Sequence, residues 1–140
     1  MEDCIFCKII KKEVPATVVF ETDRVLAFMD IKPINPGHVL VIPKKHSEFI
    51  SSMSEEDLKE IMSIGAKVDS ALRKSGIKCS GVSFFLADGV DAGQEVPHVH
   101  LHVIPRFEED GFGFKFPSGY ETMPERSELV ELSEKIKKVI

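Results

Sequence analysis

The chain has 140 residues, 43% of them hydrophobic, and a formal net charge of -5 at pH 7. This length and apolar content predict one domain with a hydrophobic core over residues 1–140. The acidic balance disfavours a nucleic-acid partner, because such binding neutralises many phosphates, but it allows a small phosphorylated ligand. No apolar run approaches the roughly 20 residues that span a membrane. Because the first residues lack a secretory signal and the three cysteines suit a reducing compartment, we expect a cytoplasmic protein with no membrane partner.

The first half of the chain predicts a short helix followed by three strands. Apolar residues recur at helical spacing before Val14-Pro15, where the proline ends the pattern, and this predicts a helix over residues 4–12. Three apolar runs rich in β-branched residues follow, each bounded by turn residues or prolines. They predict strands over residues 17–21, 25–30 and 38–42.

The second half begins with a long helix, for which Ser54 is a typical N-cap and Gly76 a typical C-terminal stop. An apolar run over residues 81–87 predicts a strand, and the strict alternation over residues 98–105 predicts another that is half-buried. Residues 106–124, rich in phenylalanine, glycine and proline, predict an irregular loop. A last helix is predicted from the spacing of Leu129, Leu132, Ile136 and Val139.

Together these elements predict an α+β fold with a five-stranded antiparallel sheet. The long helix lies between strands three and four, and a short N-terminal helix and a C-terminal helix complete the fold. The hairpin-like connections disfavour a doubly wound parallel sheet.

The residues most suited to chemistry form the run His98-Val-His-Leu-His-Val-Ile-Pro105. Side chains alternate along a strand, so His98, His100 and His102 share one face, with neighbouring α-carbons roughly 6.5 Å apart. Adjacent imidazoles repel one another when protonated, so we expect a ligand on this face. A metal trio and a polar face without a role are the alternatives. The preceding loop, residues 88–94, contains two glycines and can direct backbone N–H groups at an anion, although a plain loop is equally compatible.

Residues 93–103, Gly-Gln-Glu-Val-Pro-His-Val-His-Leu-His-Val, resemble the alternating histidine signature of the histidine-triad (HIT) family. Residues 4–10, 25–31 and 36–46 resemble family segments in the same order, so the resemblance covers about residues 4–106 and leaves 107–140 as a C-terminal extension. The microbial, Hint-like branch is the most similar. The resemblance implies a homodimer in which two five-stranded sheets join.

In activity, the resemblance implies a nucleotide-binding hydrolase or transferase that acts on nucleoside 5′-phosphoramidates or related adenylyl conjugates. It implies that His100 is the nucleophile and forms a covalent nucleotidyl intermediate, that His102 contacts the phosphate oxygens, and that the His98 carbonyl orients the His100 ring. A neutral imidazole attacks phosphorus readily and leaves well once protonated, so no catalytic metal is required. The backbone that the resemblance places against the phosphate belongs to Gly93, Gln94 and Glu95.

Positions that match the family's nucleoside pocket supply one carboxylate and an apolar surface. Asp30 can accept hydrogen bonds from both ribose hydroxyls, and the apolar side chains suit a purine, so we expect an adenosine-containing nucleotide. An ordinary core role is the alternative for the apolar members. The set is Ile5, Phe6, Ile9, Phe28, Asp30 and Ile31.

Two positions depart from the family pattern. Ala87 stands where most members have an asparagine, and Glu95 replaces a serine or threonine that donates to the leaving group. Two other functions therefore stay open: a diadenosine polyphosphate hydrolase, and a nucleotide-binding or interaction module with little turnover.

Cys4 and Cys7 lie three residues apart on a predicted helix, so their thiols can share one side, as two ligands of a tetrahedral zinc site do. The resemblance implies that His46 and His98 complete a structural Cys₂His₂ zinc site. A redox Cys-x-x-Cys motif and a pair of reduced helix cysteines are the alternatives.

Overall fold

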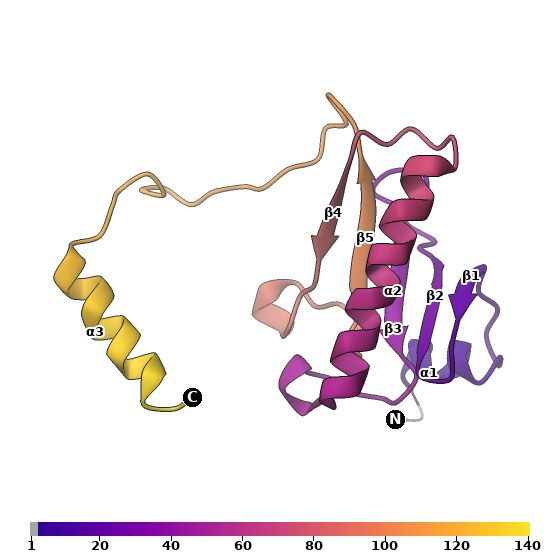
Figure 1. Cartoon of the computed structure of the whole chain (residues 1–140), viewed down its shortest axis with the longest axis horizontal. Coiled ribbons are helices and arrows are strands. Elements are labelled where there is room, and N and C mark those ends of the chain that lie inside the picture. Colours follow the sequence, from indigo (N-terminus) through magenta and orange to yellow (C-terminus); the bar gives the residue numbers. More distant parts are fainter. Residues whose placement is uncertain (1–2) are drawn as a thin grey trace.

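The computed structural model describes residues 3–140 (Figure 1). One antiparallel sheet has the strand order β1-β2-β3-β5-β4. Its strands are β1 Val18–Glu21, β2 Val25–Met29, β3 Val39–Pro43, β4 Gly81–Phe85 and β5 Leu101–Arg106. Helices occupy α1 Ile5–Ile10, α2 Glu55–Lys74 and α3 Arg126–Lys137, with short 3-10 turns at Ile50–Ser52 and Val90–Ala92. The predicted α+β fold, with its long helix between strands three and four, is confirmed.

Helix α2 crosses one face of the sheet (Figure 1). Ser54 caps it, because its hydroxyl accepts from the backbone N–H of Asp57 over 3.2 Å. Gly65 allows the close approach, since a Cβ there would lie 2.9 Å from Leu101 Cδ2 and 3.0 Å from Phe84 Cε1. The buried apolar residues of α2 pack on this face against the sheet, and they are Ile61, Ile64, Val68 and Leu72.

A second, smaller apolar cluster contains α1 together with β2 and β3. Phe6 and Cys4 pack there with Phe28, and Leu26, Leu40 and Ile42 complete the buried set. Burial on both faces makes β5 a core strand, in which Leu101 and Val103–Pro105 are buried. The prediction of a half-buried strand is therefore wrong, because Ile104 is buried on the motif face and Phe6 packs against His98 and His100.

Strand β5 begins at Leu101, three residues later than predicted. Pro97 has no N–H, and the N–H of His98 donates to Val96 O over 2.8 Å in a tight local turn. The N–H of Val99 then donates to Ser47 O over 2.7 Å, outside the regular ladder. His98 and His100 therefore lie in extended chain just before the strand that carries His102.

Residues 107–140, which we call the C-terminal arm, leave the sheet at the end of β5 (Figure 1). Residues 107–125 contain no helix or strand, and α3 lies away from the sheet with its apolar residues exposed to solvent. Leu129, Val130 and Ile136 are 52%, 52% and 58% exposed. None of the helices between residues 3 and 140 is both long and apolar enough to cross a membrane.

Candidate active site

The three motif histidines follow one another along the chain into β5, and the rings of the last two are in contact. The ring centroids of His100 and His102 are 4.9 Å apart. The Phe6 ring of α1 meets His98 and His100 nearly edge-on, at centroid distances of 5.8 and 5.3 Å. The short helix thus forms one wall of the site, and its aromatic ring packs against both imidazoles.

His98 is fully buried, and its ring is held from both sides. Its Nε2–H donates to the Pro43 carbonyl over 2.8 Å, which leaves the lone pair of the neutral ring on Nδ1. That nitrogen lies 3.5 Å from Cys4 Sγ and 3.7 Å from Cys7 Sγ. Burial lowers the pKa of His98 to about 4, so the ring is neutral at physiological pH.

His100 has the opposite arrangement of its ring nitrogens. Its Nδ1–H donates to the carbonyl oxygen of His98 over 2.7 Å, the contact that the resemblance implied. The lone pair of the neutral ring is therefore on Nε2. Within residues 3–140 no fully buried side-chain nitrogen lacks a partner, and Nε2 makes no hydrogen bond, so this nitrogen reaches solvent. An accessible lone pair on an oriented imidazole is what a nucleophile requires.

His102 has a partner that sequence reasoning missed. Its Nδ1 lies 2.9 Å from Nε2 of His38, and the Asp30 carboxylate is 3.5 Å from the same His38 nitrogen. Burial lowers the pKa of His102 to about 4, so it is neutral near pH 7. The signal that could have found His38 is the register of β3 against β5, in which Leu40 is opposite His102 and His38 shares its face.

The backbone expected to bind phosphate is largely occupied. The N–H of Gly93 donates to Val90 O over 2.9 Å, and that of Gln94 to Gly89 O over 3.1 Å. These bonds close the 3-10 turn before the motif, and phosphate binding by the backbone of Gly93 and Gln94 stays a prediction. Among the described residues, the N–H of Glu95 has no hydrogen-bond partner and can bind an anion.

The predicted nucleoside residues divide into buried and exposed members. Phe6 and Phe28 are 6% and 3% exposed and pack edge-to-face, 5.7 Å between centroids, with Ile9 beside them. Ile5 and Ile31 are 40% and 91% exposed, so their side chains are free to contact a ligand. The apolar set is thus part core and part accessible surface.

Asp30 and Ala87 occupy contrasting positions. The Asp30 side chain is 15% exposed, and its Oδ1 accepts from the N–H of Lys32 over 2.8 Å. Ala87 is 2% exposed and offers no polar group to a ligand. The carboxylate is thus placed for hydrogen bonding, whereas the departure at Ala87 is buried.

Cys4, Cys7, His46 and His98 bring one ligand atom each to within 4.8 Å of one another. His46 Nδ1 lies 3.3 Å from Cys7 Sγ. A tetrahedral zinc ion, with bonds of about 2.3 Å to sulfur and about 2.0 Å to nitrogen, separates these atoms by roughly 3.6 Å. The sulfur–nitrogen distances of this cluster therefore fit a tetrahedral Cys₂His₂ site.

The α+β fold has an antiparallel sheet, three alternating histidines and a short helix with cysteines packed beside them. These features define a histidine-triad domain. The chain belongs to the HIT domain family, whose match spans residues 11–109. It is 50% identical over 116 residues to an uncharacterized HIT-like protein of Borreliella burgdorferi, covering 82% of this chain and 84% of the relative. It is 39% identical over 137 residues to an adenosine 5′-monophosphoramidase of Schizosaccharomyces pombe, covering 96% and 98%.

Solved structures agree with this assignment. A HIT family protein from Bacillus subtilis superposes with a TM-score of 0.89 at 36% identity, covering 99% of this chain and 97% of that one. A zinc-bound histidine triad family protein from Mycobacterium smegmatis superposes with a TM-score of 0.77 at 32% identity, covering 96% and 98%. The histidine-triad resemblance drawn from the sequence is confirmed.

The low pKa values predict that stability depends on pH. An unfolded-chain imidazole titrates near 6.5, whereas burial lowers the pKa of His98 and His102 to about 4. Between these two pKa values the unfolded chain binds more protons than the folded protein does. The free energy of unfolding is therefore highest above pH 6.5 and decreases towards pH 4. Each ring contributes a slope of up to about 1.4 kcal/mol per pH unit. Urea denaturation across this range measures it.

The His102→Asn variant isolates one ring that lies outside the cluster of Cys4, Cys7, His46 and His98. Its unfolding free energy should vary less steeply with pH than that of the wild type. The difference should be the slope that one titrating ring contributes. A slope identical to that of the wild type would show that His102 titrates normally in the folded protein.

Proposed function

We propose that this chain is a HIT-family nucleotide hydrolase that cleaves nucleoside 5′-phosphoramidates or related adenylyl conjugates. The observation that carries the proposal is the accessible Nε2 lone pair of His100, set by the bond from its Nδ1–H to the His98 carbonyl. The similarity to the adenosine 5′-monophosphoramidase over nearly the whole chain supports the phosphorus–nitrogen bond as the target.

In the first step, Nε2 of His100 attacks the α-phosphorus, a new N–P bond forms, and the bond from phosphorus to the leaving amine breaks. The amine takes a proton from water as it leaves. The His100 ring becomes cationic during attack, and the His98 carbonyl 2.7 Å from Nδ1 stabilises that positive charge through a stronger hydrogen bond. His102 donates a hydrogen bond to a phosphoryl oxygen.

In the second step, water attacks the phosphorus, the N–P bond to His100 breaks, and the attacking water releases a proton to solvent. The imidazole leaves as a neutral ring because Nδ1 carries its proton, and a nucleoside monophosphate is released. Asp30 binds the ribose hydroxyls through its carboxylate. The purine packs between the buried cluster of Phe6 and Phe28 on one side and the exposed side chains of Ile5 and Ile31 on the other.

We also propose that Cys4, Cys7, His46 and His98 hold a structural zinc ion. Support comes from the sulfur–nitrogen distances of 3.3 to 3.7 Å and from the lone pair that His98 directs at the sulfurs. The zinc-bound M. smegmatis relative is consistent with this. When bound, zinc would tie α1 to the chain around β3 and β5. A closed four-ligand site leaves no position for substrate, so the chemistry stays with the imidazoles.

A homodimer is our third proposal, with two sheets joined along their β4 edges. Strands β1 and β4 are the edges of the sheet. A register shift between Val18 and Phe20 makes β1 irregular, which disfavours edge pairing, whereas β4 pairs regularly with β5 over Gly81–Phe85. Phe84 and Phe85 are 40% and 39% exposed there, and Leu129, Val130 and Ile136 of α3 are also exposed.

Replacing the nucleophile tests the hydrolase proposal. His100→Ala should lower kcat for an adenosine phosphoramidate by roughly 10⁴-fold or more, while nucleotide affinity changes by less than about tenfold. Denaturation without acid during turnover of a labelled substrate should leave label on His100 of the wild type. Values of kcat/KM for diadenosine tetraphosphate and adenylyl sulfate rank the competing substrates. Full activity in His100→Ala would refute the mechanism.

Metal analysis tests the zinc proposal. Cys7→Ser should lose near-stoichiometric zinc and melt at a lower temperature, yet keep most of its turnover once folded. Cys79→Ser is the matched control, since Cys79 lies outside the cluster and donates only to Gly81 O. The zinc site is contradicted if the wild-type protein holds no zinc and a chelator does not change its melting temperature.

Light scattering tests the dimer. At low micromolar concentration the measured mass should be about twice the 15.7 kDa of one chain. A monomer mass under these conditions would exclude the proposed assembly.

A further inference from the structure

His38 lies just before β3, is 1% exposed, and uses both of its ring nitrogens. The backbone N–H of Ile34 donates to Nδ1 over 3.1 Å, so Nδ1 holds the lone pair and the neutral ring carries its proton on Nε2. The Asp30 carboxylate, 3.5 Å from Nε2, favours a proton on the same nitrogen. Two independent contacts therefore make His38 a donor through Nε2.

The acceptor of that proton is Nδ1 of His102, 2.9 Å away. A neutral imidazole has one N–H, so accepting at Nδ1 leaves the His102 proton on Nε2. Within residues 3–140, Nε2 of His102 makes no hydrogen bond and no fully buried side-chain nitrogen lacks a partner, so this N–H opens to solvent. Its neighbour His100 presents a lone pair on Nε2 instead. A donor and a nucleophile thus lie side by side.

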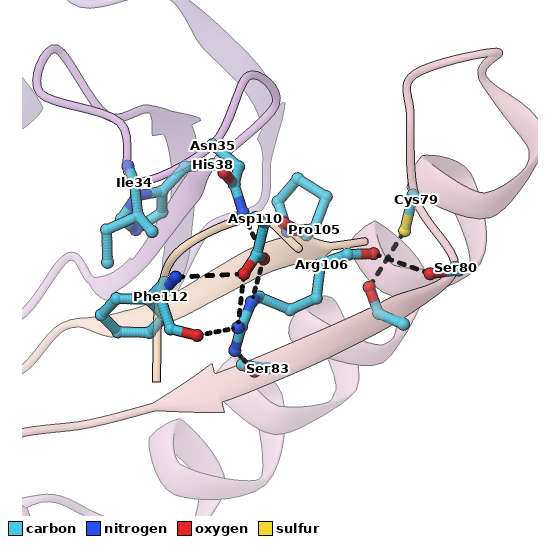
Figure 2. A network of polar contacts seen from close by, with 11 residues as sticks. Ile34, Asn35, His38, Cys79, Ser80, Ser83, Pro105, Arg106, Asp110 and Phe112 are labelled. Atoms are coloured by element: carbon cyan, nitrogen blue, oxygen red, sulfur yellow. Dashed lines mark hydrogen bonds and ion pairs between the residues drawn. The ribbon is translucent and has the colours of Figure 1, made fainter. Parts of the chain in front are cut away.

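The loop between β2 and β3 directs the Ile34 N–H at this ring because its next residue, Asn35, is anchored. The Asn35 side chain is 5% exposed and donates to Pro105 O over 2.9 Å and to Asp110 Oδ2 over 2.8 Å. Arg106 holds Asp110 through two nitrogens, with Nη2 2.9 Å from Oδ1. Figure 2 shows this network, and we call Asn35, Arg106 and Asp110 the loop clamp.

The loop clamp is extensively hydrogen-bonded and lies outside the histidine motif. Asp110 has a side chain only 4% exposed, and Arg106 also donates to Ser83 of β4 and to Phe112 O. Hydrogen bonds from Arg106, Asn35 and the Phe112 N–H hold the pKa of Asp110 well below its usual range, so the carboxylate stays charged at any physiological pH. The clamp thus joins the end of β5 to the loop that sets the protonation of His38.

We propose that His38 is a positioning residue that holds His102 in its Nε2–H tautomer, and that the loop clamp acts on the reaction through His38. The consequence for catalysis rests on the proposed hydrolase function, in which His102 donates to a phosphoryl oxygen. In the other tautomer, His102 would direct a lone pair at that anionic oxygen and repel it. His38 touches no reacting atom, so its effect passes entirely through His102.

Two substitutions at His38 separate its two contacts. Asparagine reaches the position of Nδ1 and keeps an acceptor for Ile34, but it cannot donate to His102. Glutamine reaches the position of Nε2 and keeps that donor. Long-range ¹⁵N–¹H correlation spectra of the imidazoles should show Nε2–H on His102 in the wild type and in His38→Gln. In His38→Asn the proton should redistribute to Nδ1.

Steady-state kinetics with adenosine phosphoramidate give the second readout. His38→Asn should lower kcat roughly 10- to 100-fold with little change in KM, and His38→Gln should recover most of the loss. Asn35→Ala should lower kcat in the same direction, because it frees the loop that presents Ile34. Glu108→Ala, an exposed neighbour outside the clamp, is the matched control and should behave as the wild type.

The spectra and the rates distinguish the two proposals. A wild-type His102 with its proton on Nδ1 overturns the positioning role, even if every His38 variant fails to fold. Equal losses in His38→Asn and His38→Gln also overturn it, because they indicate a structural role only. An unchanged kcat in Asn35→Ala overturns the clamp. If the wild type has the Nε2–H tautomer but no turnover, the hydrolase proposal fails and the assignment of the tautomer stands.

Discussion

The site depends on one hydrogen bond, from Nδ1–H of His100 to the carbonyl of His98. A backbone carbonyl can only accept, so its contact at 2.7 Å fixes which nitrogen of the neighbouring ring is protonated. The other nitrogen must then hold a lone pair. A free imidazole exchanges its two tautomers, whereas this ring is committed to one before any substrate arrives. Chemistry at His100 Nε2 is therefore built into the backbone conformation of the residue two positions earlier.

Burial from both sides supports that commitment. Helix α2 packs against one face of the sheet, and α1, with Phe6 at ring distances of 5.8 and 5.3 Å from His98 and His100, packs against the histidines on the other. Burial lowers the pKa of His98 and His102 to about 4, and neighbouring imidazoles lower it further. Neutral rings do not repel one another, so His98 and His102 can both be buried beside His100.

The sequence predicted the sheet, the helices and the shared face of the motif, because these follow from local periodicity and capping. It did not predict how distant segments meet. Asn35 and Asp110 are 75 residues apart and touch only because β3 and β5 pair in one register. The amides of Gly93 and Gln94 close a turn whose hydrogen bonds no spacing rule specifies. Side-chain type thus indicated the chemistry, whereas tertiary contacts decided which nitrogen or amide is available.

His98 contributes to both the cysteine cluster and the catalytic site, but through different groups. Its side chain directs Nδ1 at the cysteine sulfurs, while its carbonyl holds His100. If the sulfurs alone fixed the ring, loss of a metal would release the carbonyl as well. The bond from Nε2–H to Pro43 O, 2.8 Å long, anchors the same ring to β3 independently of any metal. Full burial of His98 adds packing on every side. The orientation of the nucleophile therefore follows from the fold, and a metal at the cysteines contributes to it by stabilising the folded state.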